Sequence, residues 1–100
     1  MGIFGNIFKS SGKAELKEKI ENGALLLDVR EVNEYQSGHA KGSVNIPLFL
    51  LPTEMNKLDP KRPIVVVCLS GGRSAQAVSL LKSRGFEAYN GGGWHSFSLV

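Results

Sequence analysis

A chain of 100 residues, 42% of them hydrophobic, can enclose one hydrophobic core but not two, so we expect a single domain over residues 1–100. Its net charge of +3 comes from lysines and arginines spread along the chain without interleaved aromatic residues, which argues against nucleic-acid binding and favours small anionic substrates. One cysteine cannot form an internal disulfide, and two histidines without ligand spacing argue against a metal site, so we expect no cofactor and a cytoplasmic location.

The first ten residues are apolar, but they are too few to span a bilayer and lack the pattern of a secretory signal. We expect a short N-terminal arm or edge strand over residues 1–10. It would pack on the core through its large apolar residues, which are Ile3, Phe4, Ile7 and Phe8.

Strands and helices alternate along the rest of the chain. Continuous apolar runs predict buried strands, while apolar residues at helical spacing followed by glycine predict helices. The expected helices lie at about 13–22, at 31–37, from near 53, and at about 75–84. The expected strands lie at 24–29, 43–47, 64–68 and 86–89, followed by a glycine-rich turn over 90–94. This order predicts an α/β fold with a mainly parallel sheet covered on both faces.

Two charged residues, Asp28 and Arg30, stand at the carboxyl end of the first buried strand. Parallel strands end at a common edge, so both should lie on the same edge as Cys68. Charges buried at such an edge are generally paired, which favours a structural role for both side chains. The spacing of Arg30 and Glu34 also predicts that these two pair along the short helix at 31–37.

Cys68 ends the central apolar strand, and two glycines and Arg73 separate it from a helix. In this arrangement the loop N–H groups and the helix N-terminus converge on one point, where they stabilise a thiolate. Arg73 adds a cation with a planar fork of donors for an oxyanion. The pattern therefore predicts a nucleophile with a lowered pKa rather than a small core residue.

Separated motifs from about Ala14 to Trp94 occur in a characteristic order. They are Leu27-Asp28-Val29-Arg30, Glu34-Tyr35, Gly38-His39, Gly42-Ser43, Asn45-Ile46-Pro47, Cys68-Leu69-Ser70-Gly71-Gly72-Arg73-Ser74 and Gly91-Gly92-Gly93-Trp94. Together they resemble the single-domain rhodaneses. The resemblance implies a rhodanese-like fold, with a five-stranded parallel sheet and helices on both faces, and sulfur transfer through a persulfide on Cys68.

The resemblance also implies which residues bind the substrate. The transferred sulfur would lie in a cradle formed by Leu69, Ser70, Gly71, Gly72, Arg73 and Ser74. Arg73 would orient an anionic donor such as thiosulfate, polysulfide or persulfide, and Asp28 and Arg30 would support the site. Cyanide or a thiol would accept the sulfur, and a protein persulfide is a further expected partner. Leu69 stands where thiosulfate-using members often carry a polar or charged residue, so we expect weak use of thiosulfate.

Two other interpretations stay open. A persulfide carrier or partner-binding module would load sulfur on Cys68 but turn over free substrates slowly. A phosphatase or arsenate reductase would use the same cysteine and arginine with a cradle one residue longer, whereas here four residues, 69–72, separate Cys68 from Arg73. The shorter loop suits a single outer sulfur better than a tetrahedral phosphate.

Overall fold

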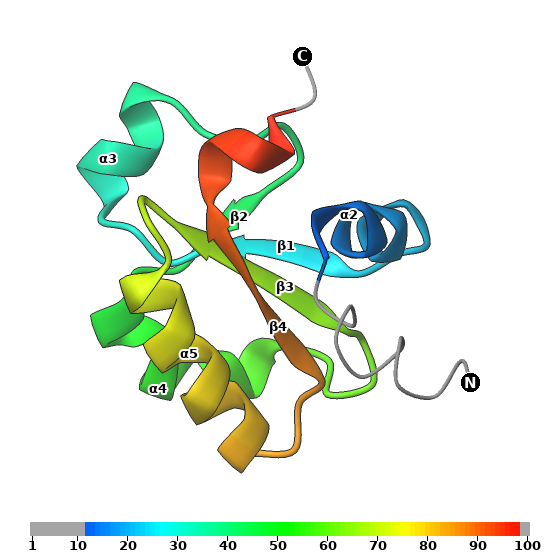
Figure 1. Cartoon of the computed structure of the whole chain (residues 1–100). Helices are drawn as coiled ribbons and strands as arrows, with labels where there is room; N and C mark the ends of the chain where they lie inside the picture. The colour runs from blue at the N-terminus through cyan, green and yellow to red at the C-terminus, as the bar shows by residue number, and fades with distance from the viewer. Residues whose placement is uncertain (1–11, 99–100) are drawn as a thin grey trace.

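The computed structural model describes residues 12–98, whose four parallel strands form one sheet in the order β2-β1-β3-β4 (Figure 1). The strands are β1 (Leu25–Asp28), β2 (Val44–Asn45), β3 (Ile64–Cys68) and β4 (Ala88–Gly93). The α-helices are α2 (Lys13–Glu21), α3 (Val32–Ser37), α4 (Leu51–Glu54) and α5 (Gly72–Ser83). Three 3₁₀ helices complete the described part: η1 (Leu48–Leu50), η2 (Met55–Lys57) and η3 (Trp94–Phe97).

The parallel register places the ends of β1 and β3 side by side. Leu25 pairs with Ile64 at the start of the two strands, and Asp28 pairs with Val67 near their ends. Cys68, one residue further, therefore lies at the same carboxyl edge as Asp28, as the sequence predicts. Ligand sites in parallel sheets lie outside this edge.

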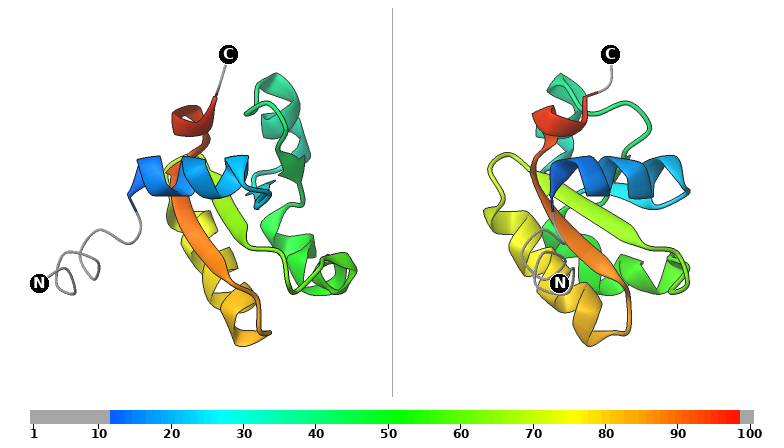
Figure 2. Two further views of the ribbon diagram at one scale, coloured as in Figure 1. Left: turned by 90° about the vertical axis from the view of Figure 1, so that its right-hand side faces the viewer. Right: turned by 45° about the vertical axis from the view of Figure 1, so that its right-hand side comes forward.

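Alternate residues of β1 and β3 face opposite sides of the sheet and build two cores. One core lies under α4 and α5: Leu25, Leu27, Val29, Leu51, Met55, Ile64, Val66, Cys68, Ala77, Leu81, Phe86 and Ala88. The other lies under α2 and η3: Leu16, Ala24, Leu26, Ala40, Val65, Val67 and Phe97. Figure 2 shows α2 and α5 on opposite faces of the sheet, so both faces of the central strands are covered.

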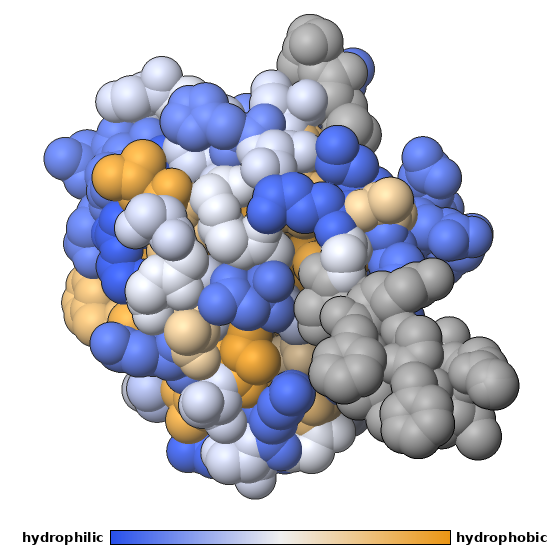
Figure 3. Space-filling view, in the orientation of Figure 1, coloured by the Kyte–Doolittle hydropathy of each residue, from blue (hydrophilic) through white to orange (hydrophobic). Residues whose placement is uncertain are grey.

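The surface carries a few large apolar side chains, and they come from separate elements. They are Val32, Val44, Phe49, Leu50 and Leu69. The face seen in Figure 3 accordingly shows small apolar patches among hydrophilic residues rather than one continuous apolar area. No helix within residues 12–98 is long and apolar enough to cross a membrane.

Three expectations about the sheet need correction or fall outside the structure. The described residues contain four strands instead of five, and the arm or edge strand expected over 1–10 lies outside them. The glycines expected in a turn instead extend β4 as far as Gly93. They can do so because strand pairing needs only backbone groups: Gly92 pairs with Val67 and Gly93 with Cys68, after an irregularity that leaves Gly91 as an extra residue.

Candidate active site

Cys68 is held in a tight turn of backbone between β3 and α5. The residue is 1% exposed. Its Sγ accepts hydrogen bonds from the N–H of Gly71 at 3.0 Å and the N–H of Ser74 at 3.4 Å, and it lies 3.4 Å from the Ser74 hydroxyl oxygen. The predicted cradle, residues 69–74, thus surrounds the sulfur with donors from the loop and from the first turn of α5.

Two glycines let the backbone come this close to the sulfur. Gly71 precedes α5 with a φ of 107°, a conformation that residues with side chains rarely adopt. At Gly93, a Cβ atom would lie 2.9 Å from the carbonyl oxygen of Leu69. A side chain at Gly93 would therefore push the loop away from its present path, and one at Gly71 would strain the backbone.

The cradle favours the ionised form of Cys68. Burial raises the pKa of the thiol, but hydrogen bonds from the Ser74 hydroxyl and from the N–H groups of Ser74, Gly71 and Ser70 outweigh it, so the pKa is lowered from its ordinary value. The lowered pKa that the sequence predicts is present, and hydrogen bonds are its main cause.

Asn90 ties the loop to β4, and sequence reasoning did not identify it as a site residue. Its Oδ1 accepts from the Ser74 hydroxyl at 2.7 Å and from the N–H of Gly92 at 2.9 Å. Its Nδ2 donates to the Gly71 carbonyl at 3.2 Å. One side chain therefore holds the cradle at Gly71 and at Ser74, and the only signal in the sequence is an asparagine before three glycines.

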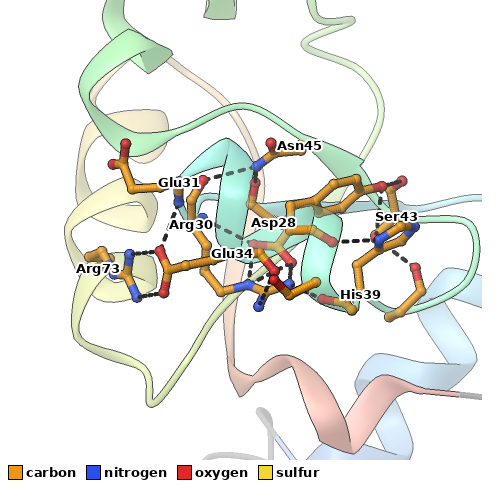
Figure 4. A network of polar contacts seen from close by, with 12 residues as sticks. Asp28, Arg30, Glu31, Glu34, His39, Ser43, Asn45 and Arg73 are labelled. Atoms are coloured by element: carbon orange, nitrogen blue, oxygen red, sulfur yellow. Dashed lines mark hydrogen bonds and ion pairs between the residues drawn. The ribbon is translucent and has the colours of Figure 1, made fainter.

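Asp28 and Arg30 form a buried ion pair beside the site (Figure 4). Their exposed fractions are 0% and 3%. The Nε and Nη2 atoms of Arg30 bind the Asp28 carboxylate at 2.8 to 3.0 Å, and Nη2 also donates to the Gly38 carbonyl at 2.7 Å. The pair thus fixes the segment around Gly38 to the end of β1.

The predicted pairing of Arg30 with Glu34 is wrong. Arg30 donates to the main-chain carbonyl of Glu34 at 3.3 Å, while the Glu34 carboxylate binds Arg73 from the cradle. The two Arg73–Glu34 hydrogen bonds measure 2.6 and 3.1 Å. Arg73 is the largest cause of the lowered Glu34 pKa, about 2. Arg30 instead turns toward Asp28, because its Nε and Nη2 atoms both find acceptors on that carboxylate.

A shallow groove of about 290 Å³ runs beside Leu69, at the edge of the cradle. Its lining consists of Arg30, Glu34, Ser37, Gly38, Leu69, Trp94 and His95. The Trp94 ring stacks on His95 and lies 4.7 Å from the Arg30 guanidinium carbon. Trp94 therefore covers the buried ion pair and forms one wall of the groove.

His39 takes a structural position, whereas His95 lies in the lining of the groove. His39 donates through Nδ1 to the Tyr35 carbonyl at 2.8 Å and stacks on the Tyr35 ring, which anchors the segment after α3. Across residues 12–98, no three His, Cys, Asp or Glu side chains gather in a way that could hold a metal ion.

Comparison with known proteins gives a consistent picture. The sequence model of the rhodanese-like domain matches residues 12–99. The chain is 37% identical over 84 residues to the putative sulfurtransferase YtwF of Bacillus subtilis, covering 82% of each protein. It is 38% identical over 67 residues to the thiosulfate sulfurtransferase GlpE of Pseudomonas savastanoi, covering 67% of this chain and 63% of that protein.

Other relatives are longer than the matched region. The chain is 38% identical over 73 residues to the putative sulfur carrier protein YrkF of Bacillus subtilis, and the match covers 71% of this chain but 40% of that protein. Among solved structures, the human single-domain sulfurtransferase TSTD1 superposes with a TM-score of 0.71 at 26% identity, covering 83% of this chain and 88% of that one.

Proposed function

The chain belongs to the rhodanese-like domain family, and from this premise we propose that it transfers a sulfane sulfur through a persulfide on Cys68. The observation that carries the proposal is the cradle, which directs the N–H groups of Gly71 and Ser74 at one buried sulfur atom. Preorganised donors of this kind stabilise a thiolate nucleophile and the anionic sulfur that replaces it.

The first half-reaction loads sulfur on the cysteine. The Cys68 thiolate attacks the sulfane sulfur of the donor, forming an S–S bond, while the donor's own bond to that sulfur breaks and the electron pair leaves with the remainder. With thiosulfate the leaving group is sulfite, and with a persulfide it is a thiolate. The persulfide on Cys68 carries its negative charge among the loop donors.

The second half-reaction returns the free thiolate. Cyanide or a thiolate attacks the outer sulfur, the S–S bond to Cys68 breaks, and its electron pair returns to Sγ. The lowered pKa of Cys68 makes the protein side a good leaving group for this step as well as a ready nucleophile for the first. The two steps predict ping-pong kinetics.

Intact-protein mass spectrometry tests the proposal. We expect the protein to gain one sulfur atom after incubation with polysulfide or thiosulfate and to lose it on addition of cyanide. Cys68→Ser should gain none. A matched control combines Cys68→Ser with Ser83→Cys, which moves the thiol to an exposed position at the end of α5.

The control separates catalysis from simple thiol reactivity. Loading of the native protein much faster than of the relocated thiol supports the proposal. Equal loading of both, or no sulfur on the native protein from thiosulfate, polysulfide or an alkyl persulfide, would overturn it.

A further inference from the structure

The charged group expected to bind an anionic donor is already occupied. Both oxygens of the Glu34 carboxylate bind the Arg73 guanidinium, at 2.6 and 3.1 Å (Figure 4). This two-pronged arrangement is the one that a sulfonate or another oxyanion would use. A donor that needs Arg73 must therefore displace Glu34 from it.

The Glu34 carboxylate is also held in place by a hydrogen bond at the start of its own helix, α3. Its Oε1 accepts the main-chain N–H of Glu31 at 2.9 Å, as part of the capping box that begins α3. The side chains of Arg73 and Glu34 are 34% and 30% exposed, so water screens the pair only in part. A carboxylate fixed in this way competes well with a donor that arrives from solution.

The groove beside the cradle offers little unbalanced charge. Leu69, 55% exposed, and Trp94 are among the residues that line it. The charged residues lining the groove include Arg30, which is paired with Asp28, and Glu34, which is paired with Arg73. Within the cradle, backbone N–H groups serve one anionic sulfur, and in the groove beside it a second negative charge on the donor meets the Arg30 guanidinium, which is already paired with Asp28.

We propose that Glu34 holds Arg73 away from the donor and so makes the site select persulfide donors of low charge over the thiosulfate dianion. The inference rests on the sulfurtransferase function proposed above. In the favoured step, the Cys68 thiolate attacks the outer sulfur of R–S–SH, the S–S bond of the donor breaks, and R–S⁻ leaves and takes up the proton from the new persulfide, which stays as an anion among the loop donors. Glu34 acts through Arg73 and is a positioning residue.

The test compares the rates at which thiosulfate, a dianion, and a simple alkyl persulfide, which carries at most one negative charge, load sulfur on Cys68. Intact mass at several donor concentrations measures the loading. Glu34→Gln keeps the side-chain length and the oxygen that caps α3 but removes the charge. We expect the thiosulfate-to-persulfide ratio of loading rates to rise about tenfold, the effect of one charge-assisted contact. Glu15→Gln, the same charge change on exposed α2, should leave the ratio as it is.

The same comparison in an Arg73→Ala background shows whether Glu34 acts through Arg73. There the substitution Glu34→Gln should no longer change the ratio. A gain that persists without Arg73, or a ratio that Glu34→Gln leaves unchanged, would overturn the inference while the sulfurtransferase function stands. If Glu34→Gln does not fold, Glu34→Asp, whose side chain is one methylene shorter and draws the carboxylate back from Arg73, gives the same reading. Failure of both donors to load the native protein would instead overturn the function itself.

Discussion

The Ser74 hydroxyl donates its one proton to Oδ1 of Asn90 at 2.7 Å while its oxygen lies 3.4 Å from the Cys68 sulfur. When Cys68 is a thiol, its S–H can donate to the Ser74 oxygen and both contacts are satisfied. When Cys68 ionises, the hydroxyl can stabilise the thiolate only by turning its proton from Asn90 to the sulfur. Asn90 Oδ1 then still accepts the hydrogen bond from the N–H of Gly92.

This relationship predicts that Ser74→Ala raises the pKa of Cys68. The Ser74 hydroxyl is the largest of the contributions that lower it, and a hydrogen bond to a charged group corresponds to about one pKa unit. The rate of alkylation by iodoacetamide, measured against pH, gives the pKa directly. Ser79→Ala, at an exposed position on the same helix, is the control and should leave the titration in place. An unchanged midpoint in Ser74→Ala would show that the backbone N–H groups alone set the pKa.

Local sequence signals predicted the strand, loop and helix around Cys68. The apolar run before Cys68 indicates a strand buried on both faces, and the glycines after it indicate a tight loop, although the helix already begins at Gly72. Asp28 and Arg30 could be placed because parallel strands share a carboxyl edge and a buried charge needs a partner. These inferences use residues close together in the chain.

The contacts that sequence reasoning missed join distant segments. Glu34 and Arg73 lie on α3 and α5, and the rule for pairs along one helix gave Glu34 the wrong partner. The hydrogen bonds from Asn90 to the loop depend on the register of β4 against β3, which a run of glycines does not specify. The same lack of side-chain pattern hid the continuation of β4 through Gly93.

Changing either partner of the buried pair Asp28–Arg30 should lower the free energy of unfolding strongly. Asp28→Asn leaves the Arg30 charge buried without its counter-ion, which costs about 3 to 5 kcal/mol of the free energy of unfolding. Urea denaturation measures the loss. Glu54→Gln, which breaks the exposed pair with Lys57, should cost about 0 to 1 kcal/mol. Similar losses in the two variants would contradict the structural role given to Asp28.

Two adjacent glycines of the cradle should respond in opposite ways to alanine. Gly71→Ala forces a side chain into a left-handed conformation, with a φ of 107°, and should cost about 1 to 3 kcal/mol. Gly72→Ala begins α5 with open space around the added methyl group and should stabilise the protein by about 0.4 to 1 kcal/mol. Thermal unfolding of both variants measures the difference. A stable Gly71→Ala variant would mean that the loop can adopt another path around Cys68.

The ion pair between Glu34 and Arg73 should make stability fall in acid. The pKa of Glu34 is lowered from 4.5 to about 2 in the folded protein, so the folded state binds this proton less readily than the unfolded state. Its contribution to stability is complete above pH 4.5, declines as the pH falls from 4.5 to about 2, and is lost below about 2.

Urea denaturation of the native protein and of Glu34→Gln at a series of pH values should show a difference in stability that shrinks over that range. Glu15→Gln controls for the general loss of one acidic group, because its exposed carboxylate has no such partner among the described contacts. A difference that stays constant from pH 6 to pH 2.5 would show that the carboxylate charge of Glu34 does not stabilise the fold, since any such effect is lost as the carboxylate is protonated over this range.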